Sequence, residues 1–255
     1  MRYGVVLVTA VVALVATALL FLPLALRHRA AGRLPEIFDG TTSVYAVRLT
    51  GGAPKQVLRL HGQWEFPVAT SDGKAVILER PQLTGTGVWR IPLSGGRPVH
   101  LRELRTFTQP VVRTNGFTAV EKETRGAARW RIDLLVRDGR GHIVWRRQMP
   151  LPSGVVSAAP DGRRVVAVRM HRVELVRPRR ITLLASDGGQ SFAPLWTRDG
   201  RSVLYWNAKQ QLVVVDVASG ARRALVRGHY FENALSADGR TVYVLGVNDA
   251  VSIPK

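Results

Sequence analysis

The chain has 255 residues, of which 46% are hydrophobic and 22% are charged, and this globular composition excludes wholesale disorder. It contains no cysteine, which excludes disulfides, a thiolate nucleophile, iron–sulfur clusters and Cys-based zinc sites. The 37 lysines and arginines outnumber the 18 aspartates and glutamates, which leaves a net charge of +19. Such a surface favours polyanions or anionic lipid as partners.

The first element in chain order is an apolar run. Residues from Gly4 to Leu26 carry no charge, and as a helix rising about 1.5 Å per residue they are long enough to cross a hydrocarbon layer of about 30 Å. A secretory signal is the alternative, with Ala16-Thr17-Ala18 as its cleavage site. Cleavage there would leave the apolar residues 19–26 exposed, so we expect residues 1–26 to be a retained membrane anchor.

The charges that flank this run bear on its orientation. Arg2 and the α-amine precede it, whereas Arg27, Arg29 and Arg33 follow it, and that count places the rest of the chain on the cytoplasmic side. A short basic tail before a long apolar run is also typical of a signal-anchor, which places the rest of the chain outside. Residues 27–37 then form a basic, proline-containing linker.

Residues 38–255 contain a repeat of Asp-Gly turns between β-rich runs. Consecutive turns are 43, 46, 38 and 39 residues apart from Asp72 to Asp238, which matches the roughly 40–45 residues of a four-stranded propeller blade. β-Branched and aromatic residues follow the turns, as in Val203–Trp206, and favour strands over helices. The five turn pairs are Asp72-Gly73, Asn115-Gly116, Asp161-Gly162, Asp199-Gly200 and Asp238-Gly239.

Each pair suits a reversal between two antiparallel strands, because Asp or Asn bonds a nearby backbone amide and Gly accepts a positive φ. A second hairpin follows in each unit, where a strand leads into a glycine-containing turn. The strands predicted for this position are Val44–Thr50, Val88–Ser94, Leu134–Arg137, Ile181–Ser186 and Leu212–Ser219.

This order of strand, Ser/Pro-Asp-Gly-Arg/Lys turn, strand and second hairpin resembles the TolB-type, WD40-like β-propeller repeat over residues 38–255. The resemblance implies an all-β propeller in which Asp72, Asp161, Asp199 and Asp238 hold turns and do not catalyse. The sequence shows no counterpart of the additional amino-terminal α/β domain of TolB, so TolB's partners are not carried over. Many relatives are extracytoplasmic, and the resemblance therefore implies an outward-facing propeller.

The order of parts predicts how the ring closes. The repeat region begins with an outer hairpin, Val44–Leu58, and ends with an inner one, Leu235–Val247. Together they complete one blade and remove exposed edges. The 218 residues at a mean spacing of 41.5 give about five four-stranded blades, or six if Val251–Ile253 adds a strand to an extra sheet.

No residue pattern predicts catalysis. The six histidines form no His-x-x-x-His or His-x-His pair, and the sequence lacks Gly-x-Ser-x-Gly, P-loop and dinucleotide-binding motifs. We therefore expect no catalytic residues, no metal and no cofactor, and the enzyme alternative is a pair of carboxylates meeting in the central channel. Most tryptophans are expected to pack between blades, with Trp64 and Trp196 as candidates for the channel.

The arginines are the candidate binding residues. Seven of them lie within 18 residues, opposed only by Glu174, and if this stretch forms two strands of one blade, their guanidinium groups can grip phosphates or carboxylates at one rim. The alternative explanation is a coding bias toward arginine with solvent-facing strand positions. The seven are Arg163, Arg164, Arg169, Arg172, Arg177, Arg179 and Arg180. A second set, tempered by two aspartates, is Arg125, Arg129, Arg131, Arg137, Arg140, Arg146 and Arg147.

These features predict a non-enzymatic binding or scaffold module. We expect a propeller held on the outer side of the cell membrane by residues 4–26, presenting its arginines to a protein or an anionic envelope polymer. The alternative is a cytoplasm-facing propeller that binds nucleic acid, which the flanking arginines and the net charge favour and which predicts steep salt dependence.

Overall fold

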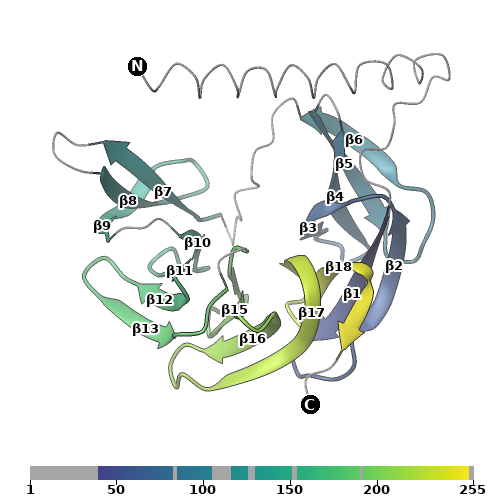
Figure 1. Ribbon diagram of the computed structural model, residues 1–255. Helices are drawn as coiled ribbons and strands as arrows, with labels where there is room; N and C mark the ends of the chain where they lie inside the picture. Colours follow the sequence, from purple (N-terminus) through teal and green to yellow (C-terminus); the bar gives the residue numbers. More distant parts are fainter. Residues whose placement is uncertain are drawn as a thin grey trace, which may run out of the picture.

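The computed structural model describes residues 40–82, 85–104, 116–125, 130–150, 154–189 and 192–252. Its strands form five antiparallel blades arranged around a central axis (Figure 1), which confirms the predicted all-β propeller and its blade number. The predicted anchor, residues 1–26, and the linker, residues 27–37, lie outside the described residues. Within the described ranges, no helix has the length and apolar character needed to cross a bilayer.

The first three blades are separate sheets, each ordered as in the sequence from the central axis outward. Blade 1 consists of β3 (Glu65–Ala69), β4 (Ala75–Gln82), β5 (Gly85–Pro92) and β6 (Val99–Leu104). The described strands of blade 2 are β7 (Thr118–Arg125), β8 (Trp130–Arg137) and β9 (Ile143–Met149). Blade 3 consists of β10 (Val155–Ala158), β11 (Val165–Arg169), β12 (Arg172–Val176) and β13 (Ile181–Ala185).

Blades 4 and 5 share one seven-stranded sheet, because β17 (Arg222–Leu235) is the outer strand of blade 4 and then the inner strand of blade 5. The other strands of blade 4 are β14 (Leu195–Trp196), β15 (Ser202–Trp206) and β16 (Gln211–Asp216). Blade 5 is completed by β18 (Thr241–Ser252), β1 (Thr41–Arg48) and β2 (Lys55–His61).

The two ends of the repeat region close the ring as predicted. Strand β1 lies between β18 and β2, with Thr42 opposite Val247 and Arg48 opposite Thr241. Val251 continues β18 and pairs with Gly228 of β17. The expectation that a strand from Val251 would begin a sixth sheet is therefore wrong, because this segment extends an existing ladder.

Apolar side chains from facing blades form the core. Strand β11 is buried along its whole length because its residues alternate between two neighbours: Val165 and Ala167 pack toward blade 2, whereas Val166 and Val168 pack toward blade 4. A strand that is covered on both faces has a continuous run of apolar residues in its sequence. Burial of each valine side chain stabilises the fold by about 1.5–3 kcal/mol relative to its exposure to water. Equivalent clusters join blade 4 to blade 5 and blade 5 to blade 1.

Tryptophans also join the blades. The Trp145 indole N–H of blade 2 donates to the Gly162 carbonyl of blade 3 at 2.7 Å, and the Trp196 indole N–H of blade 4 donates to the Ser157 carbonyl of blade 3 at 3.0 Å. Trp196 and Trp64 are 2% and 6% exposed. The expectation that these two rings line the channel is wrong, because an apolar ring with one satisfied donor is more stable between blades.

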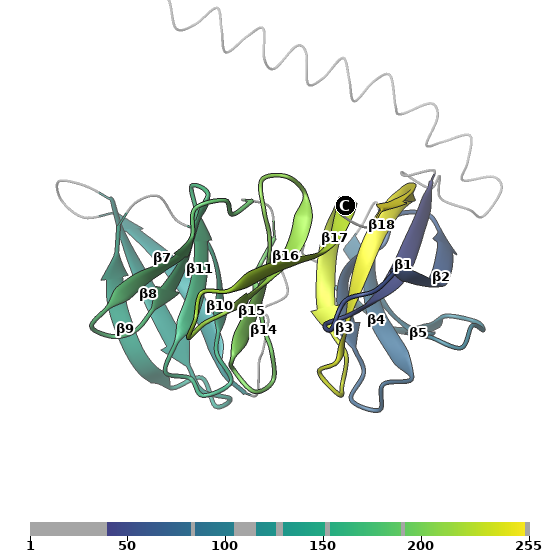
Figure 2. The ribbon, with the colours of Figure 1, turned by 90° about the horizontal axis from the view of Figure 1, so that it is seen from below.

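The ring has two faces of different construction (Figure 2). We call one of them the turn face, because it carries the Asp-Gly turns and the second hairpin turns. The two kinds of turn lie together there: the Leu49 N–H of the β1–β2 turn donates to the Arg240 carbonyl of the β17–β18 turn at 2.9 Å. Strand β1 begins, and β18 ends, at the opposite face. The chain therefore enters and leaves the propeller on the face opposite the turns.

Blade 3 departs from the predicted second hairpin. Its third strand is β12, and Ile181–Ala185 is the outer strand β13, so the expected Ile181–Ser186 position is wrong. The turn that was missed, Met170-His171, has φ values of 42° and 67° without any glycine. Sequence rules look for glycine at positive φ, and this turn gives no such signal.

Candidate functional site

The turn face is built from one repeated motif. In blade 4 the Thr197 hydroxyl donates to Asp199 Oδ1 at 2.7 Å, and the Arg201 N–H donates to the same oxygen at 3.0 Å. These two bonds, the backbone one first, hold the pKa of Asp199 below its ordinary value. The Ser202 N–H donates back to the Thr197 oxygen at 2.9 Å. The carboxylate therefore closes the turn, as the sequence implied.

The same bonding recurs in the other Asp-Gly turns. The hydroxyl of Thr70 and the N–H of Lys74 lower the pKa of Asp72, and Ser236 and the Arg240 N–H lower that of Asp238. Asp161 accepts from the Arg163 N–H at 2.9 Å, with Ala159 in the hydroxyl's place. Asn115 lies outside the described residues. The turn glycines, all at positive φ, are Gly73, Gly116, Gly162, Gly200 and Gly239.

Neighbouring turns contact one another through these glycines. A Cβ atom placed on Gly200 would lie 2.9 Å from a nitrogen of Arg164 in blade 3, and one on Gly239 would lie 3.2 Å from the Arg198 side chain in blade 4. A Cβ on Gly162 would lie 2.5 Å from the ring of Phe117 in blade 2. The turns of blades 2 to 5 therefore form a continuous surface beside the central axis.

Among the connections that the structure describes, positive charge is concentrated on this surface. The turns of the turn face, counted between strand ends, carry eleven basic side chains against five aspartates. The described connections of the opposite face contain two residues of fixed charge, Asp187 and Lys209. The eleven are Lys74, Arg97, Arg140, Arg163, Arg164, Arg177, Arg179, Arg180, Arg198, Arg201 and Arg240.

The structure divides the seven predicted arginines between the two faces. Strand β11 runs from the Asp161 turn to the opposite face, and β12 returns to the turn face. Five of the seven therefore lie in turn-face loops: Arg163, Arg164, Arg177, Arg179 and Arg180. Arg169 and Arg172 lie at the other end of the same two strands.

Arg169 is a buried structural residue. Its side chain is 4% exposed, forms an ion pair with Glu121 of blade 2, lies 3.6 Å from Glu174, and donates to the Pro150 carbonyl at 3.0 Å. Arg172 is exposed and contacts Glu174 at 2.9 Å. These contacts leave Arg169 no access to an external anion.

Other arginines of the two predicted sets are engaged to different degrees. Arg164 pairs with Asp161 at 2.9 Å and lies over the Trp196 ring at 5.1 Å. Arg147, from the second predicted set, donates to the carbonyls of Arg177 and Pro178 at 3.0 Å and so ties blade 2 to blade 3. Arg163, Arg179 and Arg180 are exposed.

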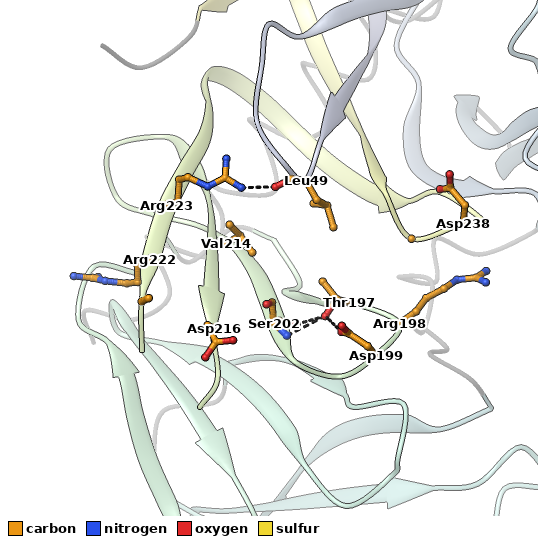
Figure 3. Close-up of a pocket in the computed structure, with 12 residues that line it drawn as sticks. Leu49, Thr197, Arg198, Asp199, Ser202, Val214, Asp216, Arg222, Arg223 and Asp238 are labelled. Atoms are coloured by element: carbon orange, nitrogen blue, oxygen red, sulfur yellow. Dashed lines mark hydrogen bonds between the residues drawn. The ribbon is translucent and has the colours of Figure 1, made fainter. Parts of the chain in front are cut away.

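A cavity of about 540 Å³ opens on the turn face between blades 4 and 5 (Figure 3). Leu49 and Val214 form its apolar part and pack on the core between these blades. Its arginines do not converge, because Arg223 donates to the Leu49 carbonyl and Arg222 pairs with Asp187 at 3.0 Å. Three aspartates balance its three arginines, so this cavity is not a dedicated anion pocket.

Three glutamates meet where blade 5 joins blade 1. Glu65 of β3 lies directly opposite Glu79 of β4, and Glu232 of β17 accepts a bond from the Phe66 N–H. Burial, reinforced by the charges of Glu65 and Glu79, raises the pKa of Glu232 to about 8. Sequence reasoning missed this cluster because its members come from distant segments. Within the described ranges, no group of His, Asp or Glu side chains is arranged to hold a metal ion.

Comparison with known proteins addresses the fold. No protein-family model matches the sequence, and no curated protein matches it. A structure of a protein assigned as a TolB from Agrobacterium tumefaciens superposes with a TM-score of 0.50 and 13% identity, covering 82% of this chain and 99% of that one. TolB from Acinetobacter baumannii gives 0.38 and 13%, covering 89% and 68%, and the Cps50 (Swd1) propeller of Myceliophteria thermophila gives 0.39 and 14%, covering 72% and 62%. The chain is thus a β-propeller, and it shares this fold with the TolB structure from Agrobacterium tumefaciens.

Proposed function

We propose that this protein is a non-enzymatic, membrane-tethered binding module whose working surface is the turn face. The observation that supports this most directly is the difference between the two faces: the turn loops carry a large excess of arginine and the described loops opposite carry one charge of each sign. Charge gathered on one face steers and holds an oppositely charged partner. The partner class is a protein or an anionic envelope polymer.

The tether is the apolar run from Gly4 to Leu26, and the propeller lies on the outer side of the membrane. Because β1 begins at the face opposite the turns, a chain arriving from the bilayer reaches that face first. The turn face is then directed away from the lipid and toward partners in the surrounding compartment. This arrangement favours a polymer or protein partner over the bilayer surface itself.

The absence of cysteine makes the test clean, because a single introduced thiol is the only one in the chain. Ser71→Cys places it in an exposed turn of the turn face, and Ala208→Cys places it in an exposed loop opposite. A membrane-impermeant maleimide should label both variants in intact cells. In isolated membranes Ser71→Cys should react more slowly than Ala208→Cys, and that protection should disappear after purification.

The outcomes separate the parts of the proposal. Labelling only after lysis would contradict the outward orientation and support the cytoplasmic, nucleic-acid-binding alternative. Protection of Ala208→Cys without protection of Ser71→Cys would contradict the assignment of the turn face.

A further inference from the structure

Four basic residues occupy equivalent positions in four Asp-Gly turns: Lys74, Arg163, Arg201 and Arg240. Each directly follows the turn glycine, and each backbone N–H donates to the turn aspartate at 2.9–3.0 Å. The backbone is therefore held in the same way in four blades, and the side chain begins from the same place in each. Phe117 occupies this position in blade 2. We call these four residues the basic ring.

The basic ring is available to a ligand. All four side chains are exposed, and none forms an ion pair with another described residue. Other basic groups on this side do form such pairs, as Arg90 does with Asp72 and Arg164 with Asp161. The nearby turn aspartates act on three of these side chains electrostatically, Asp72 on Lys74, Asp199 on Arg201 and Asp238 on Arg240, without a direct ion pair.

The four turns that carry the basic ring lie against one another at their glycines. The Gly200 position touches the blade 3 turn, the Gly239 position touches the blade 4 turn, and the Gly73 position lies 3.9 Å from Ala237 in the blade 5 turn. The four charges thus follow one another around the mouth of the central axis, from blade 3 through blades 4 and 5 to blade 1. A single ligand molecule can contact all of them.

The described surroundings of the ring offer few anchors for two classes of partner, with Phe117 of blade 2 as a partly exposed aromatic ring at the equivalent position. A protein interface needs large apolar or aromatic anchors at its centre, and single-stranded nucleic acid needs exposed aromatic rings for base stacking. The exposed large apolar side chains of the described residues lie outside the Asp-Gly turns: Val68, Val99, Leu101, Val120, Ile143, Val144, Met170 and Leu183. The nearby Trp145 and Trp196 direct their indole N–H groups to backbone carbonyls.

Polymer stiffness distinguishes the remaining candidates. Duplex DNA has a persistence length of roughly 150 base pairs, so over one small domain it is a straight rod that crosses a ring along one line. A flexible chain of phosphate groups can curve and place a phosphate at each of the four positions. Arginine and lysine both bind phosphate oxygens through charge-assisted hydrogen bonds.

We propose that the basic ring of Lys74, Arg163, Arg201 and Arg240 binds a flexible phosphate polymer that carries no bases. This inference rests on the proposed function, since it takes the turn face as the binding surface. Recognition depends on charge and on the circular arrangement of the cations. It requires no pocket, in keeping with the balanced charges of the cavity between blades 4 and 5.

The test compares two charge-matched variants of the full-length protein in non-ionic detergent. The ring variant combines Lys74→Gln, Arg163→Gln, Arg201→Gln and Arg240→Gln. The control combines Lys122→Gln, Arg131→Gln, Lys209→Gln and Arg227→Gln, which are exposed residues outside the turns of the turn face. The probe is long-chain inorganic polyphosphate, with duplex DNA of similar charge as the comparator, titrated at several salt concentrations.

We expect the ring variant to bind polyphosphate at least about tenfold more weakly near physiological salt, and the control to change less than about threefold. Loss of four phosphate contacts should lower the slope of log Kd against log salt by about 3, since each contact contributes ~0.7. Wild-type protein should bind polyphosphate more tightly than duplex DNA.

Equal losses in the ring and control variants would overturn the inference, because net charge alone would then explain binding. Duplex DNA bound as tightly as polyphosphate would also overturn it. If wild-type protein fails to bind polyphosphate while Ser71→Cys stays protected in membranes, the ring inference is wrong and the proposed function stands. Loss of that protection as well would remove both.

Discussion

Two boundaries between blades, which we call seams, contain ionisable side chains shielded from solvent: the seam between blades 2 and 3 and the seam between blades 5 and 1. The negative charge of the glutamates is neutralised in a different way at each. At the first, Arg169 lies between Glu121 and Glu174. At the second, three glutamates meet, and burial raises the pKa of Glu232 so that it keeps its proton at neutral pH. Neutralisation by a guanidinium is independent of pH in the ordinary range, whereas neutralisation by a proton is not. The two seams should therefore respond differently to mutation and to pH.

The largest effect is expected from Arg169→Met. The substitution keeps much of the volume but leaves Glu121 and Glu174 without the Arg169 guanidinium in a buried site. Breaking a buried charge network in this way costs about 3–5 kcal/mol. Urea denaturation at pH 7 measures the loss, and exposed Arg163→Met should stay within about 0.5 kcal/mol of wild type. A loss below about 1 kcal/mol would show that the seam does not depend on its arginine.

The second effect concerns Glu232→Gln. A folded pKa of about 8 against an ordinary value of 4.5 means that the folded state holds this proton more tightly than the unfolded state. The contribution of Glu232 to stability is therefore complete below about pH 4.5 and is lost as the pH rises to about 8. Gln cannot ionise, so the variant should exceed wild type by about 2–3 kcal/mol at pH 9, after allowance for solvent screening, and the difference should become small as the pH falls to about 5.

Thermal unfolding monitored between pH 5 and 9 checks this difference. Exposed Glu103→Gln is the control, because Glu103 lies at the surface and pairs there with His100. Parallel curves for wild type and Glu232→Gln would mean that Glu232 is ionised in the folded protein at neutral pH.

The smallest effect is the difference in stability between alanine substitutions at two glycines with nearly the same φ value. Gly162 and Gly73 have φ values of 65° and 66°, so alanine is equally strained at both, at about 1–2 kcal/mol. At Gly162 the new Cβ would lie 2.5 Å from Phe117, and at Gly73 it would lie 3.9 Å from Ala237. Gly162→Ala should therefore lose about 1–2 kcal/mol more than Gly73→Ala in denaturation experiments. Equal losses would indicate that Phe117 moves aside freely.

The fold was predictable because its signals are local. Each Asp-Gly turn is closed by bonds within six residues, as Thr197, Asp199 and Ser202 show. The even spacing of such turns then indicates blades of one size. The prediction failed at Met170-His171, where two residues other than glycine adopt positive φ and the sequence pattern carries no trace of it.

The site was predictable only in part, because each strand runs from one face of the ring to the other, so residues a few positions apart lie at opposite faces. Arg164 and Arg169 are close in sequence, yet one lies on the turn face and the other is buried at the far end of β11. The partner of Arg169, Glu121, is 48 residues away. Such long-range pairs, like the meeting of Glu65 with Glu232, depend on which blades become neighbours, and single-sequence patterns do not encode that choice.

The pairing of β1 with β18 has a consequence for biosynthesis. The first described strand, β1, can pair early with β2, but its second partner is complete only when Thr241–Val247 has been made, so the last blade cannot assemble during most of translation. Contacts between such distant segments are slow to form and leave strand edges open to other chains in the meantime. A nascent chain of this kind needs protection until β18 has emerged, and removal of β18 would leave an unpaired edge on both β1 and β17.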